Sequence, residues 1–125
     1  REKKIMSTRV MKKFESVADG IDNMVAAAKY DYTLSNFNDQ MNEEFANSFM
    51  IKQGQKYIKI GKKSSCSSKM GSVWGFVVNT DDDVRFKKGD VLKPAGFNAP
   101  ARNAARGNVL EGGFSISWTG PHYLI

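Results

Sequence analysis

Apolar residues in the first part of the chain recur at alternating steps of four and three. This spacing lines one face of an α-helix, because the helix turns once in about 3.6 residues. It predicts an amphipathic helix over residues 10–28, with Ser7 or Thr8 as its N-cap and a connector at residues 30–33. The positions on the apolar face are Val10, Phe14, Val17, Ile21, Met24 and Ala28.

A second helix is predicted after this connector. Apolar side chains return at steps of four, Ser35 or Asn36 is the expected N-cap, and Gln53-Gly54-Gln55 ends the helix. Residues 1–53 are therefore expected to form a helical hairpin. The recurring apolar positions are Phe37, Met41, Phe45 and Phe49.

Apolar and polar residues begin to alternate beyond Gly54, which is typical of strands with one buried face. In Lys87-Lys88-Gly89, the glycine supplies the positive φ of a tight hairpin turn. Residues 61–71 are rich in Ser, Lys and Gly and indicate a mobile loop. The predicted strands are residues 56–60, 73–78, 84–86, 90–92 and 114–118.

These elements predict an α+β fold. The N-terminal helical hairpin is expected to pack on a small antiparallel sheet or a partly open β-barrel. A chain of 125 residues suits a single domain. The hairpin segment, residues 1–53, and the basic β-rich segment, residues 54–125, are therefore expected to form one compact unit.

The net positive charge of the protein comes entirely from the second part of the chain. The net charge is +6, but residues 1–51 hold seven basic and eight acidic side chains, whereas residues 52–125 hold twelve and five. A concentrated positive surface raises the potential that a polyanion feels. The distribution favours DNA or RNA as a partner, although a basic surface that only keeps the protein in solution gives the same count.

The composition also indicates the compartment. No apolar run approaches the roughly 20 residues that cross a bilayer, so no membrane partner is expected. No apolar core of a signal peptide follows the basic N-terminus. The single cysteine, Cys66, permits no intrachain disulfide. A cytoplasmic location is therefore predicted.

Few residues suit catalysis or metal binding. One His (His122) and one Cys (Cys66) do not make a zinc site, and the acidic run at residues 81–83 lacks the spaced ligands of a calcium loop. Cys66 has no nearby His to activate it as a nucleophile. We expect no cofactor and no metal, and the sequence argues against an enzyme.

The long connection at residues 93–108 is rich in Pro, Gly, Ala and Asn, and long connections are often functional. Arg102 and Arg106 are four residues apart, so one helical turn would place both on one side, where guanidinium groups match phosphate oxygens. Alternatively, the two arginines cap helix carbonyls or pair with acidic helices. The candidate residues for binding nucleic acid or another anion are Lys59, Lys62, Lys63, Lys69, Arg102, Asn103, Arg106 and Asn108.

Aromatic residues are interleaved with these basic residues. Rings on which bases stack, with lysines along the backbone, are typical of surfaces that bind single strands. A sheet of this size needs most of its aromatic side chains for its own core, so only a few are expected to be available. The aromatic residues are Tyr57, Trp74, Phe76, Phe86, Phe97, Trp118 and Tyr123.

A string of short motifs in residues 88–124 resembles small accessory proteins of tailed bacteriophages. The resemblance implies a setting, the cytoplasm of an infected bacterium or the virion, and binding roles such as coating nucleic acid or blocking a host factor. The motifs are Lys88-Gly89-Asp90, Lys93-Pro94-Ala95, Ala99-Pro100-Ala101, Ala105-Arg106-Gly107-Asn108 and Trp118-Thr119-Gly120-Pro121 with Tyr123-Leu124.

Three hypotheses follow. The first is a non-enzymatic module that engages nucleic acid through a basic sheet and the Arg-bearing loop. The second is a protein-interaction or inhibitor module that acts on a host protein, with a homodimer seam or partner surface on the first helix. The third, which lacks an evident catalytic base, is an enzyme on a phosphate-bearing substrate with Arg102 and Arg106 as an anion clamp.

Overall fold

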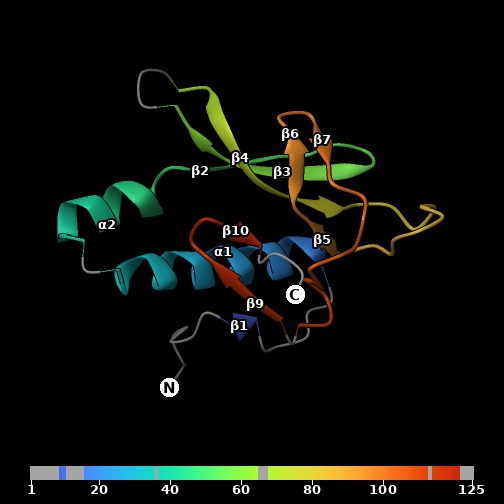
Figure 1. Ribbon diagram of the computed structural model, residues 1–125, viewed down its shortest axis with the longest axis horizontal. Helices are drawn as coiled ribbons and strands as arrows, with labels where there is room; N and C mark the ends of the chain where they lie inside the picture. The colour runs from blue at the N-terminus through green and yellow to red at the C-terminus, as the bar shows by residue number, and fades with distance from the viewer. Residues whose placement is uncertain (1–8, 11–15, 36, 65–67, 113, 122–125) are drawn as a thin grey trace.

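The computed structural model describes residues 9–10, 16–35, 37–64, 68–112 and 114–121 (Figure 1). These residues form two helices and short antiparallel strands, which confirms the predicted α+β class. The elements are β1 (Arg9–Val10), α1 (Val17–Thr33), α2 (Asp39–Ala46), β2 (Phe49–Lys52), β3 (Tyr57–Lys63), β4 (Met70–Val78), β5 (Asp90–Leu92), β6 (Pro94–Gly96), β7 (Ala99–Pro100), β8 (Gly107–Asn108), β9 (Phe114–Ser117) and β10 (Gly120–Pro121).

The central element is an open five-stranded sheet in the order β2-β3-β4-β5-β8. All of its neighbouring strands are antiparallel, and it does not close into a barrel. Strands β1, β9 and β10 form a second sheet, and β6 and β7 form a separate hairpin. The boundary expected at residues 53/54 falls in the turn between β2 and β3, so β2 belongs to the central sheet.

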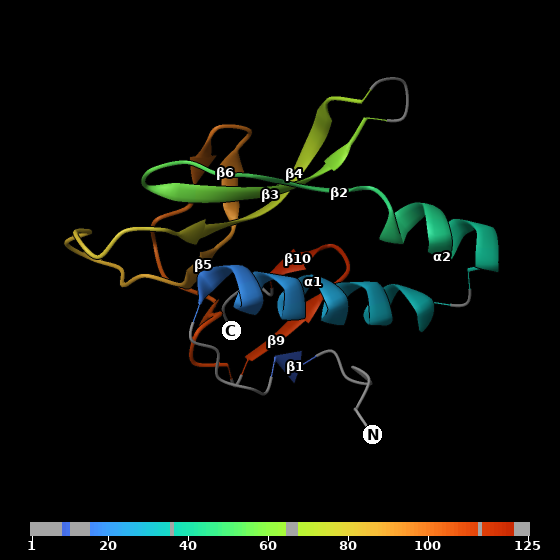
Figure 2. The same cartoon turned by 180° about the vertical axis from the view of Figure 1, so that it is seen from behind.

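Helix α1 lies between the central sheet and β9 (Figures 1 and 2). Ser16 is its N-cap and accepts a hydrogen bond from the Asp19 N–H at 3.2 Å. Met24, Ala27 and Ala28 are completely buried. The main core is thus built around this helix, with Ile60 and Trp74 among its partners from the sheet and Ile116 from β9.

Helix α2 is attached to this core by a cluster of aromatic rings. Tyr32, near the end of α1, stacks on Phe45 of α2 with ring centroids 4.1 Å apart. Trp118 meets both rings edge-on, and Phe49 joins Phe45 to Trp74. The predicted helical hairpin therefore exists, and aromatic contacts hold its second helix over the end of the first (Figure 1).

The helix boundaries differ from the predicted ones. Val10 belongs to β1 rather than to the first helix, which begins at Val17, and the predicted connector at residues 30–33 is the last turn of α1. Tyr32 explains this extension, because it follows Ala28 by four residues and continues the buried face. Phe14, the predicted caps Ser7 and Thr8, and Asn36 lie outside the described residues.

The second helix is shorter than predicted. Asn38, and not Ser35, is its N-cap and accepts the Met41 N–H at 2.8 Å. The helix ends at Ala46, and Phe49 starts β2. Phe49 still packs on Phe45, so the spacing of four correctly indicated a contact but not a continuous helix.

Three predicted loops and strands are corrected. β3 extends to Lys63 and β4 begins at Met70, so most of the described part of the predicted loop at residues 61–71 is strand. Residues 84–86 are not a strand, because the Asp83 carboxylate binds the backbone N–H groups of Arg85 and Phe86 in a turn. The connection at residues 93–108 contains β6, β7 and β8.

The predicted glycine turn at residues 87–89 is present, but the hairpin that it was expected to close is not, because residues 84–86 are not a strand. Gly89 has φ of 93°, and the Asp90 N–H donates to the Lys87 carbonyl at 3.0 Å. The turn leads into β5, which pairs with β4 and β8 rather than with residues 84–86.

Replacing Gly20 with Ala tests how tightly α1 is packed. Alanine usually favours a helix over glycine by about 1 kcal/mol, but a Cβ at Gly20 would lie 2.4 Å from the Val109 carbonyl oxygen and 2.8 Å from the Val109 Cβ. We expect Gly20→Ala to lower the free energy of unfolding by about 1–3 kcal/mol, as overpacked cores do. Urea denaturation followed by circular dichroism measures it.

Gly96→Ala is the matched control, since nothing lies within 4 Å of a Cβ built there. Its free energy of unfolding should stay within about 0.5 kcal/mol of the wild-type value. A Gly20→Ala protein as stable as the wild type would mean that α1 does not pack against Val109 this closely.

Candidate functional site

The face of the central sheet that points away from α1 carries a second, smaller core. Phe76, Val78 and Leu92 of the sheet are buried there together with Phe86. Tyr57 and Ala105 pack at its margin. This core occupies one part of the outer face and is covered by the segments that follow β4 and β7.

Arg102 and Asp83 lock those covering segments together. The guanidinium donates to both carboxylate oxygens at 2.8 and 2.9 Å, donates to the Tyr57 hydroxyl at 2.5 Å, and lies 4.9 Å from the centre of the Phe86 ring. Only 1% of the Asp83 side chain is exposed. We call this arrangement the Arg102–Asp83 latch.

The latch shifts the ionisation of both groups. Hydrogen bonds from Arg102, and then from the backbone of Arg85 and Phe86, hold the pKa of Asp83 well below its ordinary value. The hydrogen bonds of Arg102 with Asp83 and then with Tyr57 raise the pKa of Arg102. Asp83 is therefore a structural anion and not one member of a solvated acidic turn.

A basic groove, which we call the lysine groove, lies on the remaining part of the outer face and has a volume of about 490 Å³. It is bounded by edge strand β2, β3, the start of β4 and the turn between β6 and β7. None of its eight described lining residues is acidic. They are Met50, Ile51, Lys52, Lys59, Ser68, Lys69, Met70 and Phe97.

Lys59 and Phe97 are held together at one end of this groove. The Lys59 ammonium lies 4.2 Å from the centre of the Phe97 ring and donates to the Asn98 side-chain oxygen at 2.8 Å. Phe97 is nevertheless 48% exposed. Lys52 is directly opposite Lys59 in the register of β2 and β3, so positive charge is concentrated beside an accessible aromatic ring.

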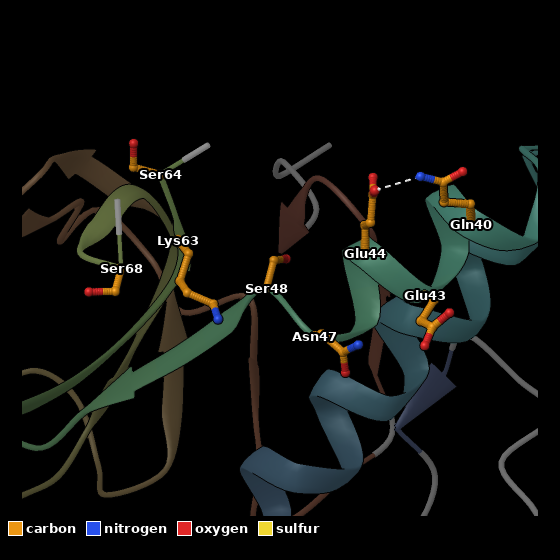
Figure 3. A pocket seen from close by; sticks show the side chains of 8 residues that line it. All are labelled: Gln40, Glu43, Glu44, Asn47, Ser48, Lys63, Ser64 and Ser68. Carbon is orange, nitrogen blue, oxygen red and sulfur yellow. Dashed lines mark hydrogen bonds between the residues drawn. The ribbon is translucent and has the colours of Figure 1, made fainter. Parts of the chain in front are cut away.

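A larger cleft of about 870 Å³ lies between α2 and the tip of the β3–β4 hairpin (Figure 3). Its walls carry Glu43 and Glu44 on one side and Lys63 on the other, and Gln40 donates to Glu44 at 3.2 Å. Charges of both signs, with serine and amide groups between them, give this cleft no preference for an anion. We therefore place the candidate site in the lysine groove.

The predicted basic residues are divided among three places. Lys59 and Lys69 line the lysine groove, and Lys63 lines the larger cleft, across from the wall that carries Glu43 and Glu44. Lys62 lies on the opposite face of the sheet, 4.1 Å from the centre of the Phe45 ring, where burial lowers its pKa. The predicted lysines thus do not form one surface.

The residues predicted from the 93–108 connection have structural contacts. Arg102 belongs to the latch, and Arg106 donates to the Ala104 carbonyl at 3.0 Å instead of joining Arg102 on a helical turn. The Asn103 side chain accepts from the Ala104 N–H at 2.9 Å. The predicted alternative, pairing with acidic helices, is also incorrect, since Arg102 pairs with the acidic turn.

Asn108 is buried and organises the turn before β5. Its amide nitrogen donates to the Lys88 carbonyl and to Asp90, at 3.0 and 2.9 Å. Its side-chain oxygen accepts the N–H groups of Leu110 and Glu111. Every hydrogen-bonding atom of this amide is therefore used within the fold, and Asn108 does not face a ligand.

Lys52, Met50 and Met70 line the site but are not among the residues predicted from the sequence. The spacing of Phe49 from Phe45 predicts a helix, and a helix does not place Lys52 and Met50 beside Lys59. Residues 49–52 are, however, also a short run of β-forming residues before Gly54. Assigning that strand would have placed Lys52 across from Lys59 in a hairpin. Nothing in the local sequence indicates that Met70 reaches the same groove.

No group of three or more His, Cys, Asp or Glu side chains suited to a metal ion occurs in the described part of the chain. Cys66 and His122 lie outside it. Among the helices that the structure describes, none is both long enough and apolar enough to cross a membrane.

Asp83→Asn tests the latch. A carboxylate whose pKa is depressed in the folded state stabilises the fold above its unfolded pKa of about 3.9, and that contribution is lost as the pH falls further. We expect the variant to be less stable than the wild type at pH 7, with the difference shrinking at pH 3. Urea midpoints at both pH values measure this.

Asp82→Asn is the control, because this neighbour is exposed. It should unfold at nearly the wild-type urea concentration at both pH values. A difference between Asp83→Asn and the wild type that stays constant from pH 7 to pH 3 would contradict an ionised, stabilising Asp83.

Comparison with known proteins places the chain in a family without an assigned activity. No curated protein and no solved structure matches it. One family model, described as a family of unknown function (DUF7717), matches residues 2–115, which is most of the chain. The protein therefore belongs to the DUF7717 family.

Proposed function

We propose that the protein is a non-enzymatic binding protein that engages nucleic acid through the lysine groove. The observation that carries the proposal is the composition of the groove: Lys52, Lys59 and Lys69 line it together with an exposed Phe97, and no described lining residue is acidic. Ammonium groups pair with phosphates and release condensed counterions, which is the main source of sequence-independent affinity for nucleic acids.

The Arg-bearing loop takes a different part in this proposal from the one its sequence suggested. Arg102 is neutralised by Asp83, so it does not supply a phosphate contact. It holds the covering segments over the second core instead. An anion clamp made of Arg102 and Arg106, and with it an enzyme on a phosphate-bearing substrate, loses its main support for the same reason.

A second candidate is a protein-interaction module that acts on an acidic host protein. β2 is an edge strand of the central sheet, and no described strand pairs with its outer side. An acidic segment could add a strand there and place its carboxylates near Lys52. The first helix supports this candidate less, because Val17, Ile21, Met24 and Ala28 are buried in the protein's own core.

The setting remains part of the proposal. Membership among the accessory proteins of tailed bacteriophages would place the protein in the cytoplasm of an infected bacterium or in the virion. Both nucleic acid and host proteins are available in that cytoplasm. Coating nucleic acid requires no catalytic residue, and the described residues of the groove offer lysines, apolar side chains and one serine.

Replacing Lys52 with Gln tests the proposal. Each phosphate contact contributes about 0.7 to 0.9 to the slope of log affinity against log salt. Lys52→Gln should therefore reduce the slope by about that amount and weaken binding about five- to eight-fold at 0.1 M salt. Fluorescence anisotropy with labelled single-stranded and duplex oligonucleotides, titrated at several salt concentrations, gives both quantities.

Lys88→Gln removes the same charge from an exposed turn outside the groove. It should change the affinity and the slope little. Equal losses for the two variants would indicate that net charge, and not the groove, determines binding. Absence of binding to either oligonucleotide at low salt would refute the proposed function.

A further inference from the structure

We infer that the lysine groove selects an unpaired strand of DNA or RNA, with one base stacked on Phe97 and the phosphates beside the lysines. The inference rests on the proposed function and specifies its ligand. Phosphate contacts alone do not distinguish an unpaired strand from a duplex. The distinction must come from the groups that lie between the lysines.

Phe97 is presented to solvent by a two-residue turn. Phe97 and Asn98 connect β6 to β7, and Gly96 pairs with Ala99 directly beneath them. The Ala101 N–H donates to the Lys93 carbonyl at 2.7 Å at the base of this hairpin. Because a short hairpin fixes the backbone, the ring is held in place while almost half of the residue stays exposed.

The floor of the groove is apolar. Met50 comes from edge strand β2, where it is opposite Gly61, and the Met70 side chain crosses β3 at this glycine. A Cβ at Gly61 would lie 2.3 Å from the Met70 sulfur, so only glycine leaves room for this crossing. A flexible thioether side chain adapts to planar groups of different shapes.

An aromatic ring and an apolar floor do not bind phosphates, which are better solvated by water or paired with cations. They suit the flat faces of bases, and in a duplex those faces are covered by neighbouring base pairs. A base that is already unpaired reaches Phe97 without the cost of unstacking. The groove therefore offers a duplex only its lysines, but offers a single strand lysines and a stacking platform.

The lysines lie along the path that a single strand of nucleic acid would follow over this apolar floor. Lys52 and Lys59 are opposite each other on β2 and β3, and Lys69 immediately precedes Met70 at the start of β4. The Lys59 ammonium, which is fixed by Asn98, lies over one face of the Phe97 ring, so a base would stack on the other face of that ring. A base stacked on Phe97 and the phosphate next to it would therefore contact neighbouring groups of the groove, the ring and the lysines.

The experiment compares four ligands for the wild-type protein and three variants. Labelled oligothymidylate, oligouridylate and a duplex of equal length are titrated at one salt concentration, and polyglutamate is used as a competitor. The variants are Phe97→Ala, Phe97→Trp and Gly96→Ala. Gly96→Ala alters the same hairpin without touching the groove, since its Cβ would meet nothing.

We expect the wild type to bind at least one of the single strands more tightly than the duplex. Phe97→Ala should weaken single-strand binding about ten-fold, because one stacked base contributes about that factor or more, and should leave duplex binding within about two-fold. Phe97→Trp should retain or improve single-strand binding. Circular dichroism and urea midpoints confirm that each variant is folded.

The failures of the two proposals differ. No binding to any oligonucleotide refutes nucleic-acid binding as a whole, and with it this inference. Equal binding to duplex and single strands, with no effect of Phe97→Ala, overturns the inference but leaves the proposed function standing. Polyglutamate that displaces the oligonucleotides at equal charge concentration also overturns it, and favours an acidic protein as the partner.

Discussion

Helix α1 has more apolar surface than a single neighbour can cover, and the rest of the structure follows from this constraint. Its buried residues include Val17, Ile21, Val25, Ala27 and Tyr32, which do not fit on one narrow stripe. The central sheet covers one side and β9 covers another. Helix α1 covers the inner face of the sheet, so a ligand that binds a face of the sheet must bind its outer face. That face is where the lysine groove lies.

The outer face is itself divided by apolar packing. Phe76, Val78 and Leu92 require a cover of their own, and the segments around Phe86 provide it. Those segments carry few hydrogen bonds of a sheet or helix, so the Arg102–Asp83 latch fixes them with charge-assisted hydrogen bonds instead. The β6–β7 hairpin contacts β4 and brings Phe97 to the lysine groove. Binding is therefore confined to the part of the face that neither the second core nor the latch occupies. The latch also neutralises one arginine, which cannot then bind an anion.

The fold class, both helices and the central strands could be predicted from the sequence, because each rests on a local period. The errors arise where one period fits two structures. Phe49 follows Phe45 by four residues, which suits a helix, yet the aromatic contact between them is made across the junction of α2 and β2. The latch could not be predicted, since its partners are brought together only by the folded sheet. The same holds for Met70, whose place in the groove depends on the missing side chain of Gly61.

The charge of the second half shows why a count of basic residues locates a site poorly. Lys62 gives up part of its hydration to lie on Phe45, and burial lowers its pKa. Lys63 lines a cleft that also carries Glu43 and Glu44, and Arg102 is neutralised by Asp83. Three lysines line the groove, which is enough to attract a polyanion with modest affinity but not to distinguish one polyanion from another. Any selectivity must therefore reside in the uncharged groups between them, because only those groups distinguish a base from a carboxylate.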